Sequence, residues 1–214
     1  MIKIYGRHTS YNVQKVLWFL EELAIEFDHV ELGGRFGGID TQEFSELNPH
    51  KKVPVLVDDD KPIWESNTIL RYLLLSYGVG NWGADDPYER SKYERWMDWS
   101  IDRLETAFVG VFWGYYRTPQ EARDMGEVNK QLSLCNTYLR DLDTALAGNS
   151  FLCGSKLSLA DISIGVFMYR LVELELGVKL PKNTAHWYAK LTELEGYRKW
   201  VMSDFSELSG RVND

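Results

Sequence analysis

Two short segments carry residue types that could hold a small polar ligand. Val53-Pro54 opens an apolar run, and Glu65-Ser66 follows that run nine residues after its end. A proline cannot donate an N–H group to a sheet, so it fits the first position of a strand. If the Val53–Pro54 bond is cis, as we expect, the main-chain N–H and C=O of Val53 point outward. An extended peptide could then pair with Val53 as an added strand does.

Glu65 and Ser66 stand where a strand is expected to end and a helix to begin. The unpaired N–H groups at a helix start can bind a carboxylate, and the Glu65 carboxylate can meet an ammonium group. Together with the main chain of Val53, these groups suit a ligand with a peptide backbone, an ammonium and a carboxylate. The sequence therefore predicts one binding site built from the three residues.

Strands and helices alternate in the first 80 residues, which predicts an α/β domain. Strands are expected at 1–5, 27–32, 53–57 and 61–64, and helices at about 10–22, 41–47 and 66–77. The first strand, helix and strand should form a right-handed crossover with parallel strands. Pro62 falls inside the last of these strands, which should therefore lie at an edge of the sheet.

The composition changes after Gly78, where a linker rich in Gly and Asp begins. Beyond it the apolar residues follow helical spacing only. One long helix is expected at 87–117, and a second is expected to open at Pro119 and run to about residue 146. The pattern indicates two domains, at 1–80 and 87–214.

A third helix has a clear start signal. Ser158 is followed three residues later by Asp161, the pattern of a capping box. We interpret both residues as structural. Shorter helices, broken at Pro181 and Gly196, complete the chain.

The charge and the apolar runs exclude several classes of function. A net charge of −8 disfavours a nucleic-acid partner, which needs a basic surface. No apolar run reaches the ~20 residues that cross a bilayer, so no membrane role and a cytoplasmic location are expected. Cys135 and Cys153 lack metal-ligand spacing and should be reduced thiols. The four histidines are scattered, so neither a metal nor another cofactor is expected.

These motifs resemble those of the cytosolic glutathione S-transferases over nearly the whole chain. The matching segments are Ser10–Glu22, Asn48-Pro49, Lys52–Leu56, Glu65–Asn67, Arg71–Leu73, Gly154 and Ser158–Asp161. The segment around Asn12 resembles a bacterial subgroup close to the theta-like and nu-like transferases. The resemblance implies a thioredoxin-like N-terminal domain, an all-helical C-terminal domain, a homodimer and glutathione as co-substrate.

Such an enzyme must hold a thiol as a thiolate at neutral pH. Lowering a thiol pKa of ~8.5 by two units requires about 2.7 kcal/mol of anion stabilisation. A helix N-terminus and one charge-assisted hydrogen bond can supply that together. By resemblance, Ser10 matches the catalytic serine of theta-like members and Asn12 the amide of nu-like members. Ser10 could instead only cap the helix, and Tyr5 is a less favoured third candidate.

The resemblance also distributes the other groups of glutathione. Val53 should pair with the cysteinyl residue, Ser66 should bind the γ-glutamyl carboxylate, and Glu65 should meet the ammonium. Lys52 and the main chain of Ile39 match positions that hold the glycyl carboxylate. Glu65 could instead be a solvated carboxylate, and Lys52 a surface charge.

The second substrate is expected between the loop before the first helix and the end of the long helix. Aromatic residues gather there, and Phe112 and Tyr116 are the expected wall residues. We expect conjugation of glutathione to small electrophilic, apolar or halogenated compounds, a detoxification activity. The alternatives are a glutathione-dependent reductase of disulfides or peroxides, and a non-catalytic binding module with the transferase fold.

Overall fold

The computed structural model describes residues 1–78, 82 and 86–211. Its contacts divide the described chain into two compact units. The first contains the residues up to 82 together with Gly196–Ser203, and the second contains 86–195 and 204–211. Most of the linker expected between residues 80 and 87 lies outside the described residues.

The first unit is built on a four-stranded mixed sheet with strand order β2-β1-β3-β4. The strands are β1 (Ile2–Tyr5), β2 (Phe27–Val30), β3 (Val55–Asp58) and β4 (Lys61–Trp64). β1 pairs with β2 in parallel and with β3 antiparallel, and β3 and β4 form a hairpin. The strand that contains Pro62 lies at an edge, as predicted.

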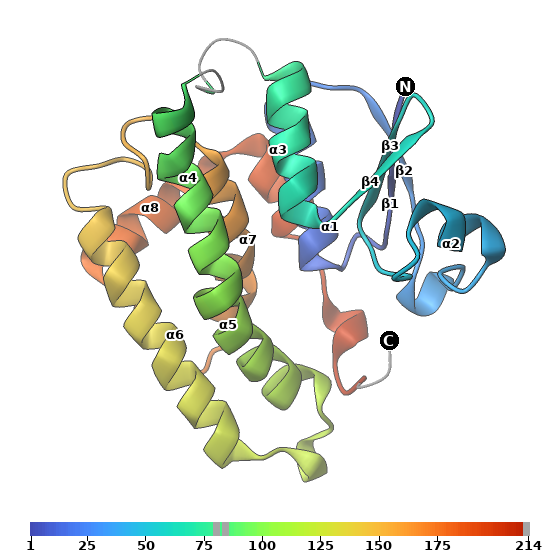
Figure 1. The fold of residues 1–214 in the computed structure, drawn as a ribbon. Helices are drawn as coiled ribbons and strands as arrows, with labels where there is room; N and C mark the ends of the chain where they lie inside the picture. Colours follow the sequence, from blue (N-terminus) through green and yellow to red (C-terminus); the bar gives the residue numbers. More distant parts are fainter. Residues whose placement is uncertain (79–81, 83–85, 212–214) are drawn as a thin grey trace. The chain divides into compact units, whose positions relative to one another are not determined.

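Helices lie on both sides of this sheet (Figure 1), with α1 (Tyr11–Glu22) and α3 (Ser66–Tyr77) on one side and α2 (Gln42–Leu47) on the other. Residues alternate along β1, so Ile2 and Ile4 are buried while Tyr5 faces α2. The ring of Tyr5 contacts that of Phe44 on α2, with centroids 6.5 Å apart. Tyr5 therefore packs on the face of the sheet away from α1.

A segment from the far end of the chain completes the first unit. The π-helix η6 (Tyr197–Val201) packs on α1, where the rings of Trp18 and Tyr197 meet edge to face at 4.8 Å. Trp200 Nε1 donates to the carboxylate of Glu21 at 3.0 Å. The residues expected to form the helical domain thus include a segment that packs with the α/β unit, because it covers the buried Trp18.

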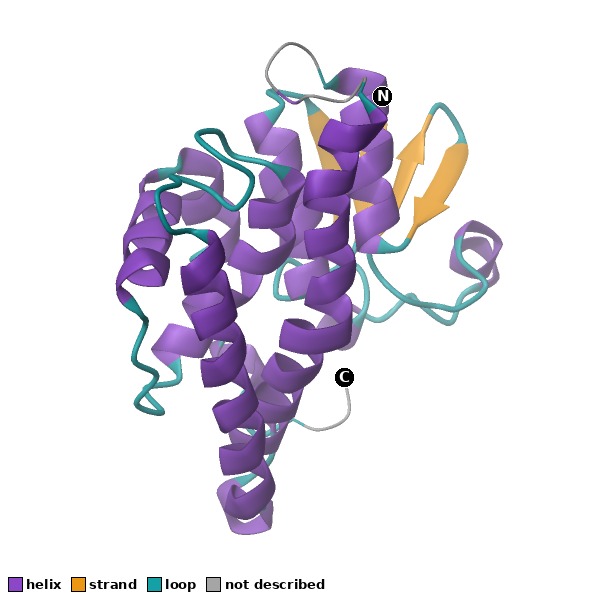
Figure 2. Ribbon diagram, turned by 60° about the vertical axis from the view of Figure 1, so that its left-hand side comes forward, coloured by secondary structure: helices purple, strands orange, loops and turns teal. Residues whose placement is uncertain are grey.

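The regular elements in the described part of the second unit are all helices, and loops join them (Figure 2). The long helix expected at 87–117 is present as one helical run with two π-helical stretches. Its parts are α4 (Pro87–Trp99), η3 (Ser100–Glu105), α5 (Thr106–Val111) and η4 (Phe112–Arg117). The sequence did not predict the π-helical stretches.

The predicted start of the next helix at Pro119 is wrong. A 3₁₀ turn, η5 (Gln120–Ala122), follows that proline, and α6 (Met125–Ala145) begins only after Asp124. The Asp124 carboxylate accepts the N–H groups of Gly126 and Glu127, which makes it the N-cap. α6 then packs along α5.

The predicted capping box at α7 (Leu159–Glu173) is confirmed. Asp161 is fully buried, and its carboxylate also accepts the N–H groups of Leu152 and Trp187 at 2.9 Å each. Because Trp187 lies on α8 (Lys182–Glu193), this one carboxylate joins two helices and a loop. The fold class predicted from the sequence is confirmed. No helix in the described ranges is long and apolar enough to cross a bilayer.

Candidate functional site

One row of paired residues runs across the first unit's sheet and brings the predicted site together. Val30 pairs with Tyr5, Tyr5 with Val55, and Val55 with Trp64. The residues that follow β1 and β4 and those that precede β3 therefore meet at one end of the sheet, beyond the ends of its strands. Those residues are the loop that leads to Ser10, the Val53-Pro54 pair and the Glu65-Ser66 pair.

Gly6 lets two of these segments approach closely. A side-chain carbon at Gly6 would lie 2.5 Å from Val13 Cγ2 and 2.9 Å from Val53 Cβ, so only glycine fits. Gly33 borders the same place, since a carbon there would lie 3.4 Å from Ile39 Cγ2 and 3.9 Å from Val53 Cγ1. Val53 and Ile39, both predicted to bind glutathione, thus border the same glycine.

Ser10 occupies the N-cap position of α1, but its side chain does not cap the helix. Its N–H donates to the carbonyl of Arg7 at 3.0 Å, and its carbonyl accepts the first helical bond, from Gln14. Among the described residues the Ser10 hydroxyl has no hydrogen-bond partner. Ser10 is therefore the N-cap residue of α1 by position, as the alternative expected, but its hydroxyl does not cap the helix.

The side chain of Asn12 is joined to that of Ser66. The Ser66 hydroxyl donates to Asn12 Oδ1 at 3.0 Å, although 54 residues separate the two in the sequence. Ser66 is 8% exposed and begins α3. Asn12, a candidate hydrogen-bond donor to the sulfur, and Ser66, the candidate ligand of the γ-glutamyl carboxylate, are thus in direct contact.

Lys15 is a polar residue of this site that the sequence reasoning missed. It is 1% exposed, and its ammonium donates to Ser66 Oγ at 3.2 Å and to Asn67 Oδ1 at 3.1 Å. A lysine inside an apolar helix face is normally assigned to the surface, which is why the pattern did not point to it. The available signal was its spacing, because Lys15 lies one helical turn after Asn12 and so on the same side of α1.

Glu65 holds an unusual backbone conformation. Its φ of 68° lies in the left-handed region, which costs a non-glycine residue of order 1 kcal/mol or more. Its carbonyl starts α3 by accepting the N–H of Ile69, while its exposed carboxylate has no partner within the described part of the chain. The carboxylate is therefore available to an external cation.

The segment before β3 offers main-chain groups and one charge. The Val53–Pro54 bond is cis, as predicted. Within the described ranges, neither the N–H nor the C=O of Val53 makes a hydrogen bond. Lys52 is exposed, and its carbonyl accepts from Asn48 Nδ2 at 2.9 Å while its ammonium has no partner among those residues.

The two predicted wall residues of the second-substrate site lie together in the second unit. The rings of Phe112 and Tyr116 stack 5.3 Å apart, and both contact Phe205. Phe112 is only 2% exposed, and Arg170 lies over its ring at 5.2 Å. Burial, with the nearby Asp204 charge, raises the pKa of Tyr116 above that of a free tyrosine, so its hydroxyl stays protonated.

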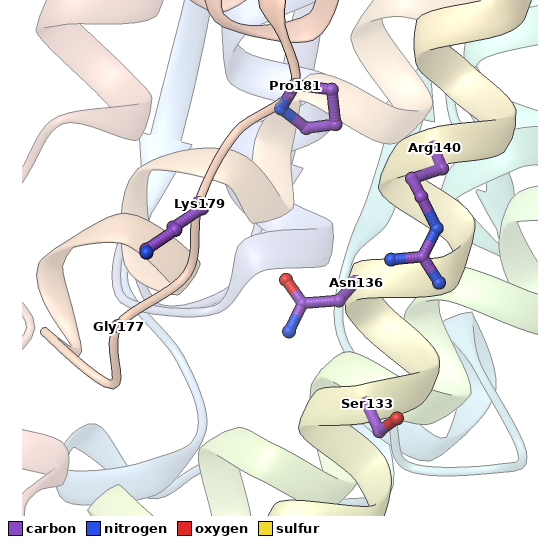
Figure 3. A pocket seen from close by; sticks show the side chains of 6 residues that line it. All are labelled: Ser133, Asn136, Arg140, Gly177, Lys179 and Pro181. Atoms are coloured by element: carbon purple, nitrogen blue, oxygen red, sulfur yellow. The ribbon is translucent and has the colours of Figure 1, made fainter.

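A separate hollow in the second unit contains none of the predicted residues. It has a volume of about 450 Å³ and lies between α6 and the loop before α8 (Figure 3). Its side chains are polar or cationic, namely Ser133, Asn136, Arg140 and Lys179, with Gly177 and Pro181 from the loop. Arg140 already donates to Thr137 on its own helix, and no further feature of the hollow indicates a ligand.

The protein's own thiols do not compete for the predicted chemistry. Burial raises the pKa of Cys135 to about 12, and burial also raises that of Cys153. Neither thiol is a ready thiolate at neutral pH. In the described ranges no three His, Cys, Asp or Glu residues are grouped so that they could hold a metal ion.

Comparison of the sequence with known proteins shows the family to which the chain belongs. The model of the glutathione S-transferase N-terminal domain matches residues 1–74, and that of the C-terminal domain matches 103–203. Glutathione S-transferase GstB of Escherichia coli is 37% identical over 204 residues, which cover 94% of this chain and 98% of GstB. This chain belongs to the glutathione S-transferase family. The resemblance read from the sequence is confirmed, as is the expectation that the chain is an enzyme.

Two further relatives match most of this chain. A theta-class glutathione S-transferase of Xanthomonas axonopodis pv. citri, solved with glutathione bound, is 36% identical with a TM-score of 0.86. The match covers 95% of this chain and 98% of that one. Dichloromethane dehalogenase of Methylorubrum extorquens is 26% identical, and the match covers 82% of this chain and 65% of the dehalogenase.

Proposed function

We propose that this glutathione S-transferase family member conjugates the thiolate of glutathione to small electrophilic, apolar or halogenated compounds. The observation that carries the proposal is the hydrogen bond between Asn12 and Ser66. It joins a candidate donor to the sulfur with a candidate ligand of the γ-glutamyl carboxylate. At the same end of the sheet, the main chain of Val53 makes no hydrogen bond to any described residue.

The proposed binding mode follows from these groups. The cysteinyl residue of glutathione pairs with the main chain of Val53 as an added strand. Its γ-glutamyl carboxylate binds the N–H and hydroxyl of Ser66 at the start of α3, and its ammonium meets Glu65. The glycyl carboxylate lies toward Lys52 and the main chain of Ile39.

The thiolate is stabilised at the start of α1. The positive end of the helix contributes about 0.3–1 kcal/mol, and up to ~2 kcal/mol in a partly buried site. A hydrogen bond from the Ser10 hydroxyl or from Asn12 Nδ2 adds about 1.5–3 kcal/mol. Together these terms match the stabilisation that a thiolate needs at neutral pH. The Ser10 hydroxyl has no hydrogen-bond partner among the residues that the structure describes, which supports its part in this role.

The substrate class, assembly and location complete the proposal. The name of the dichloromethane dehalogenase supports a halogenated carbon as electrophile. We assign Phe112 and Tyr116 to the wall of the second-substrate site, supported by their stacking and by the neighbouring Phe205. The enzyme is a cytoplasmic homodimer that acts in detoxification, as the family resemblance implies, and it needs no cofactor beyond its co-substrate.

A two-substrate assay with purified protein tests this function. Calorimetry first measures binding of reduced glutathione, and activity is then compared on a chlorinated aromatic and on a model disulfide. We expect binding and conjugation. Reduction of the disulfide without conjugation would favour the reductase alternative, and binding without either activity would favour a non-catalytic module. No heat with millimolar glutathione would refute the proposal.

A further inference from the structure

A buried lysine stands behind the proposed carboxylate site. Lys15 is 1% exposed, and its ammonium donates to Ser66 Oγ and Asn67 Oδ1, which belong to the first two residues of α3. A buried ammonium is costly unless polar groups surround it. An apolar residue would fill this position in α1 at no such cost. The lysine therefore calls for an explanation beyond packing.

Lys15 fixes the direction of a short hydrogen-bond chain. An ammonium can only donate, so Ser66 Oγ accepts from Lys15 Nζ. The single hydroxyl proton of Ser66 is then donated to Asn12 Oδ1. Because Asn12 Oδ1 accepts from Ser66, the amide nitrogen of Asn12 points away from the Ser66 hydroxyl. Lys15 thus orients the side chains of Ser66 and Asn12 through side-chain hydrogen bonds alone.

We propose that Lys15 is a positioning residue that provides the positive charge for the γ-glutamyl α-carboxylate through Ser66, and that it couples carboxylate binding to the sulfur end of the site. This inference rests on the proposed glutathione-binding function. Lys15 does not touch the ligand; it polarises the Ser66 hydroxyl, which becomes a stronger donor to an anion. The ammonium also attracts the carboxylate at short range in a site with little water.

The chain makes the two ends of the ligand interdependent. When the carboxylate accepts the hydrogen bond of the Ser66 hydroxyl, Asn12 Oδ1 loses that donor and the Asn12 amide must readjust. Asn12 is a candidate donor to the thiolate, so the readjustment reaches the sulfur. The carboxylate that is recognised should therefore influence ionisation of the thiol several bonds away.

Calorimetry with two ligands tests the role of Lys15. Reduced glutathione is compared with an analogue whose γ-glutamyl α-carboxylate is replaced by a carboxamide. Lys15→Met keeps the side-chain length and removes the charge, Lys15→Arg keeps the charge, and Lys182→Met removes an exposed charge as a control. We expect Lys15→Met to raise the Kd of glutathione about 10- to 100-fold. The Kd of the analogue should change less than about threefold.

The other two variants and the ultraviolet signal of the glutathione thiolate test the role of Lys15 independently. Lys15→Arg should retain more glutathione affinity than Lys15→Met, and Lys182→Met should match the wild type. The ultraviolet thiolate signal of bound glutathione should weaken in Lys15→Met at saturating ligand. Equal loss for both ligands would mean a merely structural lysine and would overturn the proposal, as would no loss for either.

The design separates this inference from the function on which it rests. Wild-type protein that binds neither ligand would refute the proposed function. Wild-type binding with an unaltered Lys15→Met affinity would refute only the role of Lys15. If Lys15→Met does not fold, the ammonium NMR signal of wild-type Lys15, assigned with Lys15→Arg, replaces it. That signal should move with glutathione and stay with the analogue; equal movement with both would overturn the inference.

Discussion

Gly6 and Val53 are in such close contact that a methyl group on Gly6 would place its carbon 2.9 Å from Val53 Cβ. The loop that begins at Gly6 carries Ser10, and Val53 carries the main-chain groups proposed to pair with the ligand. The absence of one side chain therefore sets the distance between two parts of the site. Three of the five predictions below concern side chains whose hydrogen bonds join separate segments, namely those of Ser66, Asp161 and Tyr77.

Gly6→Ala should destabilise the protein by about 2–4 kcal/mol. Roughly 1 kcal/mol comes from the backbone, because φ at Gly6 is +148°, and about 1–3 kcal/mol from overpacking against Val13 and Val53. Urea unfolding measures the loss. Gly148→Ala is the control, since its φ is +79° but no atom lies within 4 Å of the added carbon. Equal losses for the two variants would contradict the close contact.

Ser10→Ala should leave stability nearly unchanged, within about 0.5 kcal/mol, because the Ser10 hydroxyl caps nothing. Thr41→Ala is the matched control and should cost about 1 kcal/mol, since Thr41 Oγ1 accepts the N–H of Phe44. The same Ser10→Ala protein and Asn12→Ala should each be examined for the ultraviolet thiolate signal of bound glutathione. If neither variant lowers that signal, the donor assignment is wrong.

Ser66→Ala should weaken glutathione binding by about 1–3 kcal/mol, because a charged ligand group loses one hydrogen bond. Calorimetry gives the dissociation constant directly. Ser45→Ala on α2 serves as a control, since Ser45 is only partly exposed and its hydroxyl donates to the carbonyl of Thr41. An unchanged constant in Ser66→Ala would remove the carboxylate from this residue.

Asp161→Ala should cost at least about 3 kcal/mol, enough to threaten folding. The carboxylate accepts from the N–H groups of Leu152 and Ser158, from the Ser158 hydroxyl and from Trp187, and all four would lose their acceptor. Thermal unfolding and Trp187 fluorescence report the change. Asp141→Ala, at an exposed position, should stay within about 0.5 kcal/mol. A similar effect at both positions would contradict the structural role of Asp161.

The free energy of unfolding should fall at both low and high pH because of the hydrogen-bonded cluster of Asp58, Tyr72 and Tyr77. Burial would raise the pKa of Asp58, but hydrogen bonds from Tyr77 and Tyr72 outweigh it and the net pKa is lowered. That stability is present above the ordinary Asp pKa near 4 and is lost as the pH falls through the lower folded value. The bond to Asp58 raises the pKa of Tyr77 to about 12. Its contribution is complete below pH ~10 and is lost as the pH rises toward 12.

Tyr77→Phe isolates that contribution. Urea unfolding between pH 3 and 11 should show a flatter alkaline limb and a smaller acid loss in the variant than in the wild type. Tyr88→Phe, at a tyrosine that is 71% exposed, is the control and should follow the wild-type curve. Identical curves for wild type and Tyr77→Phe would rule out the Asp58 contact as a source of pH dependence.

Local signals in the sequence were sufficient where one residue type determines a boundary. The box at Ser158 and Asp161 predicted the start of α7, and Pro62 predicted an edge strand. Pro119 misled, because a proline fits the start of a 3₁₀ turn as well as that of a helix, and the true cap is Asp124. Periodicity alone does not separate such cases.

Features that arise from packing were beyond local reasoning. The π-helical stretches on either side of α5 shift the hydrogen bonds of a helix whose apolar spacing looks continuous. Lys15 is buried where Ser66 and Asn67, some fifty residues later, supply oxygen atoms to its ammonium. The segments that carry Ser10, Val53 and Ser66 meet at one end of the sheet, as the sequence predicted, whereas the contacts of Lys15 with α3 depend on the tertiary structure.

The return of Tyr197–Val201 to α1 has a consequence for biosynthesis. On the ribosome the first unit cannot finish folding when its own strands and helices emerge, because the cover of Trp18 is still untranslated. Almost all of the chain must therefore be synthesised before the indole of Trp18 is shielded from water. Proteolytic fragments that end before Gly196 should likewise expose the apolar surface of α1 around Trp18 and tend to aggregate.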